Sequence, residues 1–193
     1  MAKASSARDD LLTAATELFR ARGYEGVGVA ELLEASGSPR GSLYFHFPGG
    51  KEQIGVEVVE RAGAAVAGQF RTLADRDITL DQFIEHVFRH TAKMVKERGF
   101  DASCPIAAIA AETAGQATAL RIAVNKQFDA WQAEVARAAQ LRGMSEKNAA
   151  DFASALITAM EGAFLVSKAQ RSIAAHQNAA KAMKALGAAL KPN

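Results

Sequence analysis

The fold of this chain is decided by residues 29–47, which read VAELLEASGSPRGSLYFHF. Apolar side chains recur at helical spacing over residues 29–35, which predicts a short helix there. Gly37 supplies a stop signal, and the serine–proline pair after it suits the cap and first turn of a second helix over residues 39–47. Two short helices joined by a glycine turn predict a helix-turn-helix.

The N-terminal end of the second helix carries small or hydrogen-bonding groups, which suit a close approach to base edges in a DNA groove. Phosphate donors are expected on its flanks, because phosphate contacts fix the register of a protein on DNA. A lysine at the start of the following helix suits that purpose, since backbone amides there favour an anion. The base-facing candidates are Ser38, Arg40, Gly41, Ser42 and Phe45, and the phosphate-facing candidates are Tyr44, His46 and Lys51.

Each candidate has an ordinary structural alternative. Arg40 contacts a guanine or is a solvated surface arginine, and Phe45 touches a thymine methyl or covers the turn of its own helix. Tyr44 and His46 bind phosphate or pack beside the next phenylalanine, Phe47. The lysine is a phosphate contact or an ordinary residue of a helix start.

The rest of the chain repeats helical signals. Apolar stripes at helical spacing alternate with glycine, serine, threonine and proline boundaries, and no alternating strand pattern recurs. Of the 193 residues 49% are hydrophobic and 23% charged, enough to bury a core. We therefore predict an all-α fold of nine helices, with a three-helix domain over residues 1–50 and a larger helical domain over residues 51–193.

The N-terminal segment resembles a known family. Gly23-Tyr24, the run LLEASGS at 32–38, the run GSLYFHF at 41–47 and Lys51-Glu52 are together similar to the N-terminal signature of TetR-type transcriptional repressors. The likeness extends over about residues 8–54. The longer run SPRGSLYFHFPGGKEQ resembles the LmrA/YxaF-like branch, as does the later segment Cys104-Pro105-Ile106-Ala107 with Glu112, more weakly.

This sequence departs from that family pattern at two places. Family members usually place threonine or serine before the second helix as a cap and phosphate donor, whereas this chain has Gly28 there. Gly28 offers its backbone N–H to a phosphate but no hydroxyl. The turn Pro48–Gly50 is one residue longer than usual, which could shift where Lys51 meets the DNA backbone.

The resemblance implies a repressor that binds a palindromic operator in double-stranded DNA as a homodimer and is released by an unknown small hydrophobic effector. It places the effector in the C-terminal domain, where apolar pockets with a few polar groups hold small ligands. The alternative is that these residues are simply core. The candidates for lining are Phe88, Thr91, Ile109, Glu112, Phe128, Trp131, Met160 and Phe164.

The last two helices are rich in small residues, which let helices approach closely. Two such hairpins related by a twofold axis predict a four-helix dimer interface. The alternative is that these helices only cover the core of their own chain. The small residues are Ala153, Ala155, Ala159, Gly162, Ala163, Ala179, Ala182 and Ala189.

Charge does not by itself indicate a nucleic-acid partner. The formal net charge is +2, and the six basic residues up to Lys51 are matched by six acidic ones. DNA affinity must therefore come from charges segregated on one face, and binding should weaken steeply with salt.

Several classes of function lack support. The single cysteine, Cys104, has no partner for a disulfide and is expected to be a buried small hydrophobe. No metal, cofactor or catalytic constellation is expected, although His86 and His90 have the spacing of a helical metal pair. The sequence shows no signal peptide and no apolar run long enough for a membrane span, so we expect a cytoplasmic protein. The rival hypotheses are a helical ligand-binding or interaction protein without DNA binding, and a small enzyme using Cys104 or the histidine pair.

Overall fold

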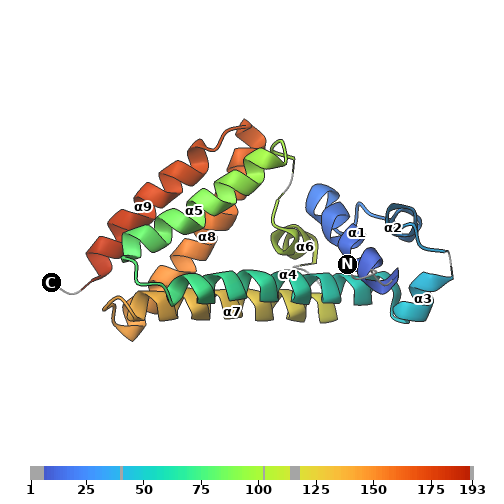
Figure 1. Cartoon of the computed structure of the whole chain (residues 1–193), viewed down its shortest axis with the longest axis horizontal. Helices are drawn as coiled ribbons and strands as arrows, with labels where there is room; N and C mark the ends of the chain where they lie inside the picture. Colours follow the sequence, from blue (N-terminus) through green and yellow to red (C-terminus); the bar gives the residue numbers. More distant parts are fainter. Residues whose placement is uncertain (1–6, 40, 102, 114–117, 192–193) are drawn as a thin grey trace, which may run out of the picture. The chain divides into compact units, whose positions relative to one another are not determined.

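The computed structural model describes residues 7–39, 41–101, 103–113 and 118–191. Within these ranges the chain forms nine α-helices and no strand, which confirms the all-α prediction (Figure 1). The helices are α1 Ala7–Arg22, α2 Val29–Ser36, α3 Ser42–His46, α4 Gly50–Ala74, α5 Leu80–Glu97, α6 Pro105–Thr113, α7 Ala119–Gln140, α8 Glu146–Gln170 and α9 Ala174–Leu190.

The chain divides into two compact units, and each is described by itself. Unit 1 takes its residues from 1–63 and 104–127, and unit 2 from 64–103 and 128–193. Helices α4 and α7 therefore contribute residues to both units. The predicted boundary between the DNA-binding and ligand-binding domains, near residue 50, remains a prediction. The boundary between the two compact units instead falls within α4, after Gly63.

Unit 1 is built on the apolar stripe of α1. Leu11, Ala15 and Phe19 are fully buried, and the Phe19 ring lies 5.3 Å from that of Tyr24. Helices α2, α3 and α6 all pack on α1. From the other elements, the fully buried side chains are Leu32, Leu43, Phe47, Ile54, Val58, Val59, Ile106 and Ile109.

The turns around α2 follow the predicted glycine signals. Gly23 ends α1 with φ +78° and Gly37 ends α2 with φ +64°, a left-handed conformation that favours glycine. The third helix is shorter than predicted: it covers Ser42–His46, and the Ser42 amide at its start donates to the Pro39 carbonyl at 2.9 Å.

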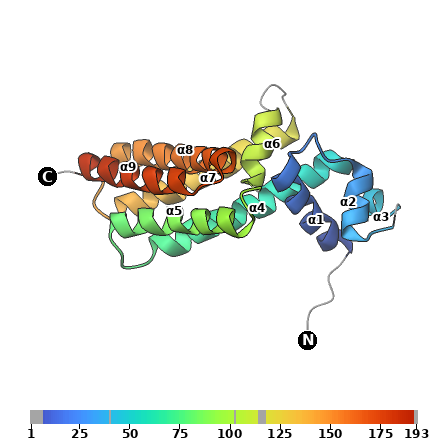
Figure 2. The same ribbon diagram turned by 90° about the horizontal axis from the view of Figure 1, so that it is seen from above.

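In unit 2, helices α5, α8 and α9 pack against one another (Figures 1 and 2). Thr79 caps α5 in a capping box with Gln82, and Ser145 caps α8 by accepting from the Asn148 amide. Gly187 lets α9 come close to α5, since a Cβ there would lie 3.0 Å from Leu80 Cδ2.

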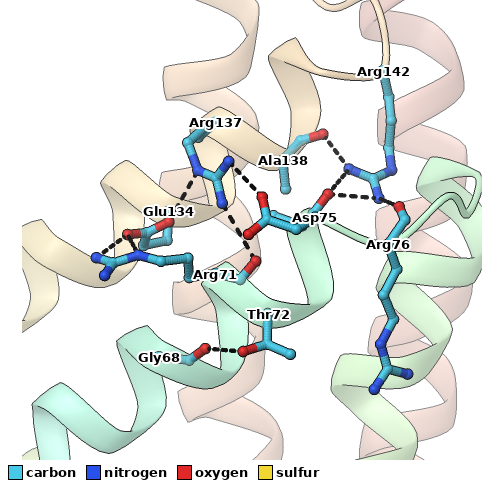
Figure 3. A network of polar contacts seen from close by, with 10 residues as sticks. Gly68, Arg71, Thr72, Asp75, Arg76, Glu134, Arg137, Ala138 and Arg142 are labelled. Atoms are coloured by element: carbon cyan, nitrogen blue, oxygen red, sulfur yellow. Dashed lines mark hydrogen bonds and ion pairs between the residues drawn. The ribbon is translucent and has the colours of Figure 1, made fainter.

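An arginine network joins the C-terminal end of α4 to α7 within unit 2 (Figure 3). Glu134 pairs with Arg71 at 2.5 Å and with Arg137 at 3.1 Å, and Arg137 also pairs with Asp75 at 2.9 Å. Burial alone raises the pKa of Glu134, but hydrogen bonds from the two arginines hold it below its usual range. Arg142 donates to the carbonyl of Ala74, the last residue of α4, and to those of Arg76 and Ile78 in the loop that follows and of Ala138 on α7.

Among the described helices, α8 is long and apolar enough to cross a membrane by length and composition, with a mean hydropathy of 1.4. A core helix passes the same test, and one such helix is weak evidence for a span. The apolar character of α8 follows from its packing, since Phe152, Leu156, Met160 and Phe164 are buried against unit 2.

Candidate functional site

The turn between α2 and α3 is open on the side where base contacts are predicted. Gly41 is exposed, and a Cβ there would have no heavy atom of the described residues within 4 Å. Ser38 is half-buried, with its amide donating to the Leu33 carbonyl at 3.0 Å. The Ser42 hydroxyl donates to the Pro39 carbonyl at 2.8 Å, so its oxygen is left as an acceptor. Arg40 lies outside the described residues.

Helix α3 presents two aromatic rings to solvent. Tyr44 is 61% exposed and Phe45 80%, whereas Leu43 and Phe47 on the opposite side are fully buried. His46 is half-buried, and its ring meets that of Phe45 edge-on at 5.0 Å. A helix held by buried residues on one side and exposing large aromatic rings on the other suits contact with a macromolecule.

The backbone N–H of Gly28, which was predicted to be available to a phosphate, is hydrogen-bonded within the protein. It lies at the N-cap of α2, and its N–H donates to Glu31 Oε2 at 3.1 Å. The hydrogen bond from this amide, followed by that from Arg22, lowers the pKa of Glu31. The amide that the sequence offered to a phosphate is therefore already occupied. The sequence signal for this hydrogen bond is a carboxylate three residues after the cap position.

Lys51 lies on the first turn of α4 and is held against the α1–α2 loop. Its Nζ atom is 4.1 Å from the Tyr24 ring centroid and 4.0 Å from Glu25 Oε2. The lysine side chain is 21% exposed. Burial, with the nearby charges of Glu25 and Glu52, raises the pKa of Tyr24 to about 12.

The basic and acidic residues that balance in number up to Lys51 also lie next to one another in the structure. Each described basic residue up to position 51 lies beside a carboxylate. The negative charge of that carboxylate weakens the attraction of the basic residue for a phosphate. The pairs are Arg8–Glu57, Arg20–Glu17, Arg22–Glu31 and Lys51–Glu25. Phosphates would have to compete with these carboxylates for the cations.

The residues predicted to line an effector pocket fall into both units. Six lie in unit 2: Phe88, Thr91, Phe128, Trp131, Met160 and Phe164; Ile109 and Glu112 lie in unit 1. Phe128 is half-buried and meets Trp131 edge-on at 5.3 Å, while the other unit 2 members are buried. The Thr91 hydroxyl donates within its own helix, to the Val87 and Phe88 carbonyls at 3.1 Å.

Glu112 does not line the core of its unit. It is exposed, and its Oε2 accepts a hydrogen bond from the Glu25 amide at 2.7 Å. Ile109, by contrast, is fully buried on α6. The contact with Glu25 was not predicted from the sequence, because the two residues are 87 positions apart.

His176 on α9 is a buried polar residue that the sequence analysis did not single out. It is 1% exposed, and its Nδ1 lies 2.9 Å from the hydroxyl of Ser167. The Nε2 atom is buried without a hydrogen-bond partner in the described part of the chain. The ring meets Phe164 edge-on at 5.4 Å, and burial lowers the pKa of the imidazole.

Two family profiles match this chain. Residues 11–58 match the bacterial regulatory proteins of the tetR family, and residues 82–182 match the C-terminal domain of LmrA/YxaF-like transcriptional regulators. The chain belongs to the TetR family. The TetR-family resemblance predicted from the N-terminal signature, together with its LmrA/YxaF-like branch, is thereby confirmed. The protein is a helix-turn-helix transcriptional regulator and not an enzyme.

Individual relatives of this TetR-family chain agree. The HTH-type transcriptional regulator LmrA of Bacillus subtilis is 30% identical over 164 residues, covering 83% of this chain and 85% of LmrA. The reduced form of NemR from E. coli superposes with a TM-score of 0.80 at 26% identity, covering 94% of this chain and 97% of NemR. A TetR regulator from Legionella pneumophila shares the fold with a TM-score of 0.86 at 16% identity, covering 95% and 98% of the two chains.

Proposed function

We propose that this regulator is a repressor that binds a palindromic operator through α3 and the turn before it. The observation that carries the proposal is the exposure of Tyr44 and Phe45 beside the open position Gly41, on a helix whose other side is buried. Small residues at the turn allow the backbone to approach base edges, and the tyrosine hydroxyl suits a phosphate. Arg40 remains the candidate for reading a guanine. We expect the protein to act in the cytoplasm, where such an operator is accessible.

A homodimer through α8 and α9 is the second part of the proposal, and the exposed faces of both helices support it. On α8, Leu165 is 70% and Val166 40% exposed, and a Cβ on the exposed Gly162 would meet no atom within 4 Å among the residues that the structure describes. On α9, Ala182, Ala185 and Ala189 are exposed at helical spacing. Small and apolar residues on both outward faces suit a four-helix contact with a second copy.

Not every small residue of this helix pair faces outward. Ala153 and Ala163 are buried in the core of their own unit, so for these two the alternative of covering their own core applies. Ala155, Ala159 and Ala179 are half-buried. The proposed interface is therefore narrower than the full set of small residues.

The third part is release by a small apolar effector bound in unit 2. The aromatic group formed by Phe70, Trp131 and the half-buried Phe128 supports this, with ring centroids 6.5 and 5.3 Å apart. Flat apolar ligands stack well against such rings. Coupling of about 1–3 kcal/mol would weaken operator binding roughly 5–150-fold.

Selection of bound sequences from random duplex DNA tests the proposal directly. We expect a motif with twofold symmetry, whose half-sites lie about 34–36 Å apart, one helical turn. Light scattering on the same preparation should give twice the chain mass. A strictly monomeric protein, or one that enriches no sequence, would overturn repression and favour a helical ligand-binding protein.

The effector is then sought by thermal shift with planar aromatic compounds. Compounds that raise the melting temperature are added to the complex of protein and selected operator. Release of the DNA supports the third part, whereas equal operator affinity with every stabilising compound contradicts it.

A further inference from the structure

Glu112 lies where α6 meets the loop between α1 and α2. Its Oε2 accepts from the Glu25 amide at 2.7 Å. Its carboxylate also fills the space beside Gly23, since a Cβ on that glycine would lie 2.0 Å from Glu112 Oε1. A carboxylate that accepts a backbone N–H makes a short, strong hydrogen bond. Glu112 therefore holds the loop by a hydrogen bond at the Glu25 amide and packs against it at Gly23, and all three residues lie in unit 1.

The loop between α1 and α2 also contacts Lys51, through Tyr24 and Glu25. The lysine ammonium lies over the Tyr24 ring, and a carboxylate oxygen of Glu25 lies 4.0 Å from it. Tyr24 is itself 9% exposed and packs on Phe19. The position of the ammonium thus depends on the residues that flank the amide bonded to Glu112.

We propose that Glu112 is a positioning residue for operator binding, which fixes residues 23–25 and through them the ammonium of Lys51. The inference rests on the proposed function, in which Lys51 contacts a phosphate.

The direction in which operator affinity changes distinguishes a positioning role of Glu112 from the mere loss of its negative charge. Removing a carboxylate from the protein makes it more positive, which by itself strengthens binding to DNA. If Glu112 positions Lys51, Glu112→Ala has the opposite effect and weakens binding. Glu97→Ala is the matched control, because it removes an exposed carboxylate of unit 2 that pairs only with Lys93 in the described structure.

The experiment measures operator affinity by fluorescence anisotropy over a series of salt concentrations, with the duplex selected by the full chain. We expect Glu112→Ala to weaken binding at least about 3-fold and to lower the salt slope by about 1, as the loss of one phosphate contact does. Glu112→Gln keeps an acceptor oxygen and should retain most of the affinity. Lys51→Ala should lower the slope equally, and the double variant should lose no more than Lys51→Ala alone.

Hydrogen exchange gives a readout that needs no DNA. In Glu112→Ala the Glu25 amide should exchange faster, while the amides of α1 keep their protection. Additive losses in the double variant, or wild-type affinity and slope in Glu112→Ala, would overturn the inference. Failure of the wild-type chain to bind any duplex would instead overturn the proposed function, and the exchange result would still report on the contact.

Discussion

Gly63 of α4 and Gln127 of α7 are packed so closely that a Cβ on the glycine would lie 2.3 Å from both Cγ and Oε1 of the glutamine. Both residues are buried in unit 1. Real Cβ atoms do not approach other atoms so closely. The Gln127 side chain can therefore lie in this position against α4 only because position 63 has no side chain.

Gly63→Ala should consequently destabilise the protein, although alanine is the better helix former. Overpacking of this kind costs about 1–3 kcal/mol, against a gain of about 0.5–1 kcal/mol from helix propensity. Chemical denaturation measures the difference. Gly68→Ala on the same helix is the control, since a Cβ there has nothing within 4 Å, and it should be neutral or stabilising. Equal effects of the two substitutions would contradict the close packing.

His176 should make stability depend on pH on the acid side. The unfolded imidazole has the ordinary pKa of 6.5, and burial lowers the pKa in the folded state. Below about pH 6.5 the unfolded chain therefore binds more protons than the folded one, so stability falls as the pH drops through this window and is flat above it. Each unit of pKa difference corresponds to about 1.4 kcal/mol.

Denaturation curves between pH 7.5 and about 5 check this expectation. His176→Gln should remove the part of the slope that belongs to this group, whereas His90→Gln, at an exposed position, should not. The same acid slope in both variants would assign the pH dependence to other groups.

Leu165→Arg should convert the proposed dimer to monomer. The substitution places a charge on an outward apolar position of α8, and a buried unpaired charge in an interface costs several kcal/mol. Leu141→Arg is the matched control, because Leu141 is 61% exposed but lies beyond the end of α7. Light scattering gives the masses, and loss of twofold DNA binding should accompany loss of the dimer. A dimeric Leu165→Arg variant would place the interface elsewhere.

Gly28→Ser should strengthen operator binding. The backbone at this position is extended, with φ −89° and ψ 158°. In the described part of the chain the one heavy atom within 4 Å of a new Cβ is Glu31 Oε2 at 3.9 Å, so serine fits without strain. Its hydroxyl can serve as a phosphate donor while the N–H stays bonded to Glu31. A gain of about 1 kcal/mol, roughly 5-fold in affinity, is the scale of one hydrogen bond. Gly28→Ala separates the hydroxyl from the methylene, and an equal gain in both variants would deny the hydroxyl any contribution.

The sequence predicted most of the helices because their signals are local. Four helix boundaries are each set by a single residue, through a left-handed conformation at Gly23 and Gly37 and through a side-chain cap at Thr79 and Ser145. The start of α3 was predicted too early, because a proline is compatible with a turn as well as with a first helical turn.

The candidate site was less predictable, because its decisive contacts link distant residues. The face of α3 follows from the spacing of Leu43 and Phe47, which are buried as core residues at i and i+4 should be. The partners of Glu112 and His176 depend on which helices meet, and periodicity does not encode this. The Glu31 contact was local and could have been found from its spacing to Gly28.

The composition of unit 1 has a practical consequence for protein engineering. The three N-terminal helices share their compact body with α6 and the first part of α7, whose Ile106 and Ile109 are wholly buried. A hybrid regulator made by exchanging only residues 1–50 would join two halves of one core that did not evolve together. Transplanting the operator specificity of this chain therefore calls for moving residues 104–127 together with residues 1–63.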